Sequence, residues 1–156
     1  MTIYFYGADE VPYGCFSNFS AHGVELDGRS WPTAEHYFQA QKFAGTRHAE
    51  AILRAPTPLR ASQLGRERTK PLRRDWEHVK DEVMRRVVEA KFRTHEDIRA
   101  VLLSTGTEEL VENTGGDHYW GRGRTGTGKN MLGRILMRTR HRLAAEEHGR
   151  HGRAMT

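Results

Sequence analysis

The chain has 156 residues, of which 37% are hydrophobic and 29% are charged, and its formal net charge is +5. This length suits one domain with one core, and three Trp, five Tyr and six Phe residues supply enough apolar surface to exclude a disordered chain. No apolar run approaches the roughly 20 residues that a membrane-spanning helix needs, and the first residues contain no basic leader, so we expect a cytoplasmic protein with no membrane partner.

Arginine dominates the basic residues, since only five of the 25 are lysines. Its rigid fork binds phosphate and carboxylate groups, so the positive field suits anionic ligands such as phosphorylated metabolites, nucleotides or nucleic acid. An arginine-rich composition also arises from genomic base bias alone, and both explanations stay open. Cys15 is the single cysteine of the sequence, which excludes an internal disulfide.

The first part of the chain predicts short strands. Residues 3–6 are β-prone and end at a glycine, and residues 7–22 follow as an aromatic loop. Two short segments, 24–26 and 29–31, flank an Asp-Gly pair, which is the turn sequence that β-hairpins favour. We therefore expect one strand, a loop and then a hairpin.

The middle of the chain predicts a series of capped helices. A capping side chain accepts a hydrogen bond from the free amides of the first turn. The expected helices are 34–44 after Thr33, 48–55 after Thr46, a segment from Pro58 after Thr57, a long helix after Asp75, and a short helix opened by a capping box of Thr94 and Asp97. In the long helix, positions 76, 79, 83, 87 and 90 are apolar at spacings of three and four, which predicts its buried face.

The last part predicts one strand, a glycine-rich loop and one helix. Residues 109–113 suit a strand, 114–128 are rich in glycine, and a helix is expected over 130–143. Residues 146–156 have no apolar face and are expected to form a disordered basic tail. Because strands and helices do not alternate, we expect not a doubly wound sheet but a single compact helix-rich α+β domain over residues 1–145, with a small β-sheet.

The segment GRTGTGKN, from Gly123 to Asn130, is one residue short of a phosphate-binding P-loop. A true P-loop follows a buried strand, whereas the residues before this segment are polar and rich in glycine, and Asn130 lacks the hydroxyl that binds magnesium. The segment therefore does not indicate a nucleotide hydrolase. Flexible glycines and the free amides of a helix that starts at Asn130 still favour an anion site, although a surface loop is the simpler interpretation.

A second polar group shares one face of the helix expected over residues 34–44. Glu35, Phe38, Gln39 and Lys42 stand at positions i, i+3, i+4 and i+7. Glu35 and Lys42 are about 10 Å apart along the helix axis, so a ligand can fit between them. The simpler interpretation is a first-turn acid that suits the helix dipole and a solvated lysine at the helix end.

No metal and no cofactor are expected. The nine histidines form no known metal-binding motif, and no G-x-S-x-G nucleophile elbow occurs. Cys15 has no evident partner that would activate it as a nucleophile. The chemistry must therefore come from the carboxylates, the lysine and the glycine-rich loop.

Several motifs together resemble the NADAR superfamily of YbiA-like N-glycosidases. They are FYG at 5–7, CFSNFS at 15–20, WPTAEHYFQAQKF at 31–43 and WGRGRTGTGKNMLGRILMRTR at 120–140. These pieces span the chain from its start to the tail, and the central helices between them match mainly by pattern. The resemblance implies a compact helix-rich domain that cleaves N-glycosidic bonds in which an exocyclic amine carries the sugar.

The resemblance also implies which residues act. Carried over by position, Glu35, Lys42 and Asp117 are the expected catalytic residues. The residues expected to bind the substrate are Gly7, Asn18, Phe19, Trp31, His36, Trp120, Gly121, Lys129 and Asn130. The glycine-rich loop and the helix start at Asn130 are expected to hold a phosphate.

Two mechanisms stay open. In one, Lys42 attacks the anomeric carbon as a Schiff-base nucleophile while Glu35 relays protons. In the other, Glu35 and Asp117 activate a water molecule, and Lys42 binds phosphate. Both use the same three side chains, so the sequence does not separate them.

Three functions stay open, in order of preference, and the resemblance implies the first two. The first is hydrolysis of phosphoribosylamino-pyrimidine intermediates of riboflavin synthesis, with release of ribose 5-phosphate. The second is removal of ADP-ribose from guanine in nucleic acid, toward which the arginine-rich surface leans slightly. The third is a non-catalytic module that binds NAD or ADP-ribose. The natural leaving group and the oligomeric state are not predicted.

Overall fold

The computed structural model describes residues 1–154, with side chains through residue 150. Within this range the chain forms six α-helices, four short strands and one 3₁₀-helix, η1 (Tyr13–Phe16). The strands are β1 (Thr2–Phe5), β2 (Val24–Leu26), β3 (Arg29–Trp31) and β4 (Glu109–Glu112). The helices are α1 (Ala34–Gln41), α2 (Arg47–Leu53), α3 (Pro58–Gly65), α4 (Trp76–Thr94), α5 (Glu96–Ser104) and α6 (Met131–Ala154).

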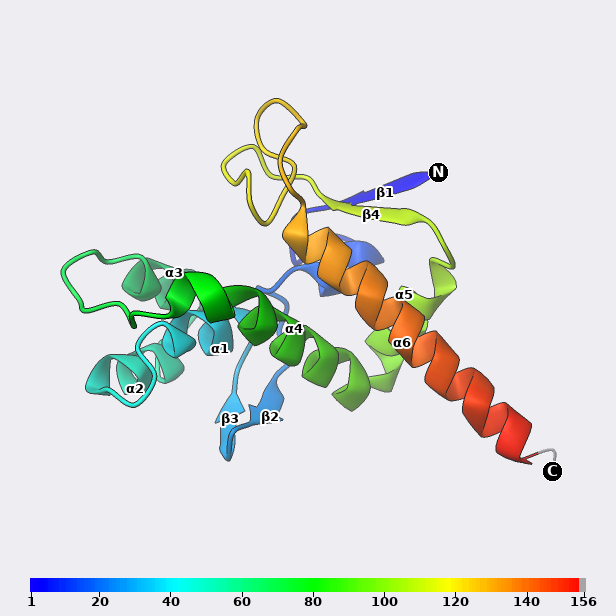
Figure 1. Cartoon of the computed structure of the whole chain (residues 1–156), viewed down its shortest axis with the longest axis horizontal. Coiled ribbons are helices and arrows are strands. Elements are labelled where there is room, and N and C mark those ends of the chain that lie inside the picture. Colours follow the sequence, from blue (N-terminus) through cyan, green and yellow to red (C-terminus); the bar gives the residue numbers. More distant parts are fainter. Residues whose placement is uncertain (155–156) are drawn as a thin grey trace.

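The strands form two separate pairs instead of one small sheet. β1 lies parallel to β4, with Thr2 opposite Glu109 and Phe5 opposite Glu112, so segments far apart in the sequence are neighbours (Figure 1). β2 and β3 form the predicted antiparallel hairpin. Its turn residues, Asp27 and Gly28, have φ angles of 54° and 75°, which is the left-handed geometry that an Asp-Gly hairpin turn requires.

Helix α1 lies inside the molecule. Every residue from Ala34 to Ala40 is buried, and the helix contacts α2, α3 and α4. The predicted cap is confirmed, because the side chain of Thr33 accepts a hydrogen bond from the amide of His36. Since seven of the eight residues of α1 are buried, the polar side chains among them need partners within the protein.

The two long helices, α4 and α6, pack against each other and against the core. Figure 1 shows α6 running from the glycine-rich loop toward the C-terminus, and this helix contacts α4, α5 and β4. The predicted apolar face of α4 is confirmed, with Trp76, Val83 and Val87 buried and Val79 and Ala90 partly buried. Among the described helices, none combines the length and the apolar character that crossing a membrane requires.

Two of the predicted helix caps are wrong. Thr46 and Thr57 cap α2 and α3 as expected, but Asp75 makes no capping bond because its carboxylate pairs with the guanidinium of Arg73 at 2.6 Å. At α5 the residue in the capping position is His95, and the hydroxyl of Thr94 instead donates to the carbonyl of Ala90 at 2.7 Å.

The predicted disordered tail is also corrected, because α6 continues to Ala154. Residues 144–147 have the sequence Ala-Ala-Glu-Glu, which favours a helix. Glu146 also pairs with Arg93 of α4, with an N–O distance of 2.6 Å. An ion pair between two helices cannot be foreseen from the hydrophobic pattern of one of them. Residues 155 and 156 lie outside the described chain.

Lys91 of α4 lies in the core, where its side chain is 1% exposed. Its Nζ donates a hydrogen bond of 2.9 Å to the backbone carbonyl of Ser17, just after η1. Burial disfavours the charged amine and lowers the pKa of Lys91 to about 7. Lys91 therefore connects α4 to the segment after η1. The free energy needed to bury it depends on pH, because only its charged form is disfavoured in the core.

The stability of the protein is expected to change with pH through Lys91. In the unfolded chain a lysine keeps its proton up to about pH 10.4, so above pH 7 the unfolded state binds more protons than the folded state. The free energy of unfolding should therefore rise with pH for the wild type relative to Lys91→Met. Urea unfolding of both proteins from about pH 6 to about pH 9.5 measures this difference. A constant difference would mean that Lys91 stays charged in the core.

Candidate functional site

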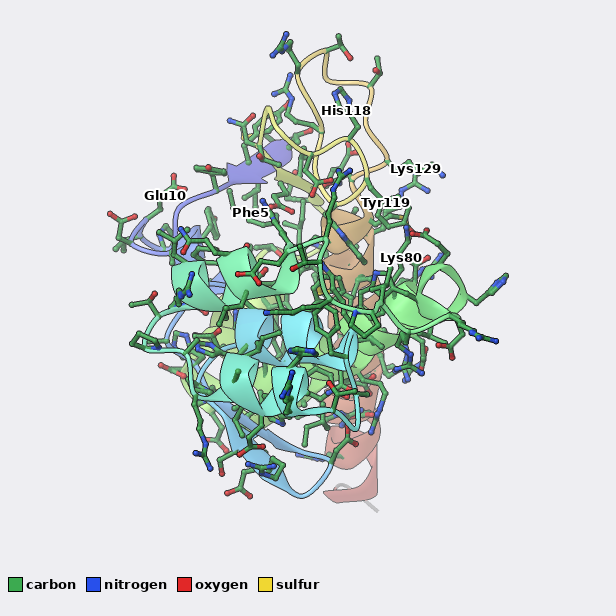
Figure 2. The ribbon with its side chains drawn as sticks, turned by 90° about the vertical axis from the view of Figure 1, so that its left-hand side faces the viewer. Phe5, Glu10, Lys80, His118, Tyr119 and Lys129 are labelled. Carbon is green, nitrogen blue, oxygen red and sulfur yellow. The ribbon has the colours of Figure 1, made fainter. Side chains whose placement is uncertain are left out.

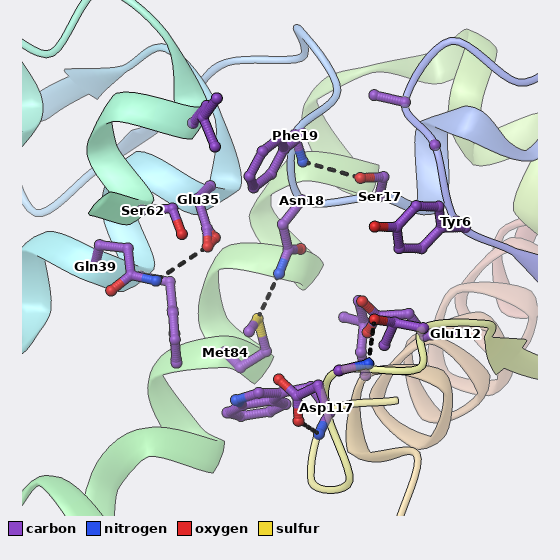
Figure 3. A pocket seen from close by; sticks show the side chains of 18 of the residues that line it. Tyr6, Ser17, Asn18, Phe19, Glu35, Gln39, Ser62, Met84, Glu112 and Asp117 are labelled. Atoms are coloured by element: carbon purple, nitrogen blue, oxygen red, sulfur yellow. Dashed lines mark hydrogen bonds between the residues drawn. The ribbon is translucent and has the colours of Figure 1, made fainter. Parts of the chain in front are cut away.

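A pocket of about 790 Å³ opens between α1, α3, α4 and two loops (Figure 3). One wall is α1, a second is formed by residues 17–19 after η1, and a third is formed by residues 112–120 at the end of β4. Three acids and two cations line it together with several aromatic rings: Glu35, Glu112, Asp117, Lys42 and Arg66 are the charged residues. Such a mixture suits a polar substrate that also carries an aromatic group.

The pocket brings together residues that lie far apart in the sequence. The three residues predicted to be catalytic, Glu35, Lys42 and Asp117, all line it. Four of the residues predicted to bind the substrate line it as well: Gly7, Asn18, Phe19 and Trp120. Their common location agrees with the predicted site, while their individual roles stay predictions.

Glu35 is held at the inner wall by the burial of α1. Its side chain is 7% exposed, and its Oε1 accepts a hydrogen bond of 3.1 Å from Nε2 of Gln39. Burial raises the pKa of Glu35, while the bond from Gln39 and the nearby charges of Arg66 and Lys42 partly oppose this rise. Glu35 is therefore easier to protonate than a free glutamate, as a proton-relaying group requires.

Gln39 stands between Glu35 and a glycine of α3. The carbonyl oxygen of its amide is enclosed without a hydrogen-bond partner among the described residues, and Gln39 is 2% exposed. A Cβ atom on Gly65 would lie 2.1 Å from that oxygen. Gly65 therefore leaves the space in which Gln39 can point its NH₂ group at Glu35.

Lys42 ends α1 beside the same glycine. Its Nζ donates to the carbonyl of Gly65 at 3.3 Å and lies 5.9 Å from the ring centroids of both Phe38 and Trp76. Burial lowers the pKa of Lys42, and Glu35 opposes this shift only in part. A lysine with a lowered pKa has more of the free amine that a nucleophile needs.

Asp117 shapes the opposite wall. Figure 3 shows Asp117 at this wall. Its Oδ1 accepts hydrogen bonds from the backbone amides of Tyr119 at 2.9 Å and Trp120 at 2.8 Å. The ring of Trp120 then packs edge-on against Phe38 of α1, with 5.2 Å between the centroids. The bonds to Asp117 thus fix the shape of the loop, and the ring of Trp120 packs the loop against α1.

Five residues predicted to bind the substrate do not line the pocket: Trp31, His36, Gly121, Lys129 and Asn130. Trp31 donates its ring N–H to the carbonyl of Leu26 within the hairpin. His36 is enclosed between the hydroxyl of Thr33 and the carbonyl of Ala55, and burial lowers its pKa. Gly121 has no room for a side chain, because a Cβ atom would lie 2.3 Å from the methyl group of Thr114.

Lys129 packs on an aromatic ring outside the pocket. Its Nζ lies 5.5 Å from the ring centroid of Tyr119, and Nζ of Lys80 lies 3.9 Å from the same centroid (Figure 2). Tyr119 also donates its hydroxyl to Asp81 of α4. Tyr119 therefore connects the glycine-rich loop to α4, and Lys129 packs on the same ring.

The start of α6 is not the free anion site that the sequence suggests. The amides of Met131 and Leu132 donate to the carbonyls of Tyr119 and Trp120, at 2.9 and 3.1 Å. Asn130 has a φ of 52°, and its side chain bridges β4: Oδ1 accepts from the amide of Glu112 at 2.9 Å, and Nδ2 donates to a β4 carbonyl at 2.8 Å. The prediction of bare amides is wrong, because the loop supplies its own acceptors.

The sequence did not point to Glu112 or Arg66 as residues of the site. Glu112 is the last residue of β4, and its position after an apolar pair of residues is a weak signal for a strand end beside a pocket. Burial, with repulsion from Asp117 and Glu35, raises the pKa of Glu112 to about 7. Arg66 follows α3, and no motif marks it. Within the described chain, no group of His, Cys, Asp and Glu side chains is arranged to hold a metal ion.

The substitution Gly65→Ala tests how Glu35 is held. The added methyl group should displace Gln39 and break its hydrogen bond to Glu35, so the pKa of Glu35 should rise further. An NMR titration of the Glu35 carboxyl carbon measures this shift. Gly149→Ala is the matched control, because its added Cβ atom meets nothing within 4 Å. An unchanged Glu35 titration in Gly65→Ala would contradict the proposed contact.

Comparisons with known proteins agree with this picture of the fold. The family described as NADAR domain matches residues 4–144. The N-glycosidase YbiA of Escherichia coli (strain K12) is 50% identical over 145 residues, which cover 93% of this chain and 90% of that protein. A riboflavin biosynthesis protein of Vibrio vulnificus (strain YJ016) is 43% identical over 146 residues, covering 94% of this chain and 39% of that longer protein.

A solved structure is also similar. The NMR structure of the Escherichia coli protein YbiA has a TM-score of 0.87 and 50% identity, covering 94% of this chain and 87% of that one. The predicted family and the predicted helix-rich α+β fold are thereby confirmed. The chain belongs to the NADAR domain family.

Proposed function

We propose that this protein is an N-glycosidase that hydrolyses the bond between a phosphorylated ribose and an exocyclic amine. The observation that carries this proposal is the convergence of Glu35, Lys42 and Asp117 on one pocket lined by aromatic rings. The similar protein of Escherichia coli is named an N-glycosidase, and the one of Vibrio vulnificus is named a riboflavin biosynthesis protein. The substrate class that we favour is the phosphoribosylamino-pyrimidine intermediates of riboflavin synthesis.

The pocket can orient such a substrate by its two ends. Phe19 and Trp120 offer aromatic faces for the pyrimidine. The phosphate needs a cation, and Lys42 and Arg66 are the cationic side chains among the described lining residues. Loop carbonyls accept from the first amides of α6, so these amides are not free to bind a phosphate. Arg66 therefore binds the phosphate, a role that the sequence had suggested for Lys129 and the glycine-rich loop.

Lys42 is the nucleophile in the mechanism that we favour. A sugar on an exocyclic nitrogen opens to an imine, and the free amine of Lys42 adds to its C1 carbon. The amine base then leaves, and water hydrolyses the imine formed between the sugar and Lys42. Burial lowers the pKa of Lys42 and raises that of Glu35, so the amine is available and Glu35 can exchange the protons of the reaction.

A water-activating pair of Glu35 and Asp117 is the competing mechanism. Asp117 lines the pocket, but one oxygen of its carboxylate already accepts two backbone amides. These bonds give Asp117 a role in shaping the loop, and we favour the mechanism that uses Lys42.

Borohydride trapping separates these mechanisms. With substrate present, reduction should leave a sugar adduct on Lys42 that peptide mass spectrometry locates. Lys42→Arg should lower kcat by more than about 100-fold, the scale expected when a catalytic group is lost. Lys70→Arg is the matched control, because Lys70 also donates to an α3 carbonyl at 3.3 Å and lies 5.9 Å from a ring centroid. Near-normal turnover by Lys42→Arg, without an adduct in the wild type, would leave the water mechanism.

A product assay tests the substrate class. The wild type should release ribose 5-phosphate from a phosphoribosylamino-pyrimidine, and Glu35→Gln should be strongly impaired. The same assay on DNA with ADP-ribosylated guanine examines the alternative reaction. Cleavage of this DNA alone would replace the proposed substrate. Binding of ADP-ribose without cleavage of either substrate would make the protein a non-catalytic module.

A further inference from the structure

The proposed reaction moves protons at two places. The attacking amine or water loses a proton on one side of C1, while the leaving nitrogen must gain one as its bond to C1 breaks. An exocyclic amine leaves poorly as an anion, so protonation of this nitrogen lowers the barrier. Glu35 lies near Lys42 and can accept the proton of the nucleophile. A second group is then required for the leaving nitrogen.

Glu112 is fixed at the wall of the pocket by its backbone. Its amide donates to Oδ1 of Asn130 at 2.9 Å, and its carbonyl accepts from the amide of Arg122 at 3.0 Å. The next residue, Asn113, donates its amide to the carbonyl of Phe5 at 2.8 Å. β1, the glycine-rich loop and the residue before α6 thus hold the backbone of Glu112 in place, which fixes where its side chain enters the pocket.

The surroundings of Glu112 favour its neutral form. Its Oε2 is enclosed and has no hydrogen-bond partner among the described residues, so an ionised carboxylate would leave part of its charge uncompensated. The charged neighbours that act on it are Asp117 from the loop and Glu35 from α1, and both are acids. Glu35 differs, because the positive charges of Lys42 and Arg66 stabilise its ionised form and oppose the rise of its pKa.

We propose that Glu112 is the general acid of this pocket and gives its carboxyl proton to the exocyclic nitrogen as the C1–N bond breaks. The proposal rests on the N-glycosidase function proposed above. The electron pair of the broken bond stays on the nitrogen, which leaves as a neutral amine, and Glu112 becomes a carboxylate. Water restores the proton of Glu112, and Glu35 returns the proton of the nucleophile to solvent. The net reaction consumes one molecule of water.

The experiment compares Glu112→Gln with the wild type on ribosylamines whose leaving amines differ in basicity. An acid matters most for a poor leaving group, so kcat of the variant should fall by about 100-fold to 10,000-fold on an unactivated aminopyrimidine. The loss should be much smaller on a nitro-substituted arylamine, which leaves without help. Glu109→Gln, an exposed position of the same strand, is the matched control and should match the wild type on both substrates.

The pH profile is the second readout. The pKa of Glu112 is raised to about 7, so the wild-type kcat/KM should fall as the pH rises through this value and the acid loses its proton. In Glu112→Gln this fall should disappear. If circular dichroism shows that Glu112→Gln does not fold, the same kcat comparison is made with Glu112→Asp, and the pH dependence of kcat/KM is measured on the wild type. Two results would overturn the role of Glu112. One is an equal loss of kcat on both substrates in Glu112→Gln together with a retained fall of kcat/KM at high pH. The other is a wild-type kcat of this variant on the unactivated aminopyrimidine.

The two proposals fail in different ways. If the wild type cleaves no ribosylamine at all, the proposed function and the role of Glu112 fall together. If the wild type cleaves the ribosylamines and Glu112→Gln shows no dependence on the leaving group, the function stands and only the role of Glu112 is lost.

Discussion

The burial of α1 is the constraint on which the rest of the site depends. A helix that is buried over almost its whole length favours polar side chains that find a partner inside the protein or lose their charge. Glu35 and Gln39 meet each other, and Lys42 reaches a carbonyl of α3. The same desolvation moves the pKa of the acid upward and that of the amine downward. Packing alone thus gives both groups the protonation behaviour that the proposed mechanism requires.

The glycine-rich loop has a structural role instead of the phosphate-binding role that its sequence suggests. Its carbonyls occupy the amides at the start of α6, and Asn130, in a left-handed conformation, connects this start to β4. Flexible glycines, open amides and a nearby lysine are the features of a phosphate loop, but here the amides are occupied and the segment connects the loop, β4 and α6. The result is a rigid wall that presents Asp117, Trp120 and Glu112 to α1.

Local patterns predicted most of the helices and the pair Glu35 and Lys42, because apolar spacing and helical repeat depend only on neighbouring residues. The location of Asp117 in the site followed from the family resemblance. Glu112 and Arg66 could not be predicted, since each enters the pocket only through the packing of other elements around it. The error at Asn130 has the same origin: a motif shows which amides a helix start contains, but not which carbonyls will reach them.

The parallel pairing of β1 with β4 also bears on how the protein folds. Parallel pairing across most of the chain closes a long loop, which is entropically costly and tends to make folding slow. The pocket takes side chains from residue 6 to residue 132, and the backbone clamp on Asn113 comes from Phe5. During synthesis on a ribosome, the first strand must therefore wait for β4 and α6 to emerge. The chain acquires its pocket only late, so a partly synthesised protein has no complete site with which to act on its substrate.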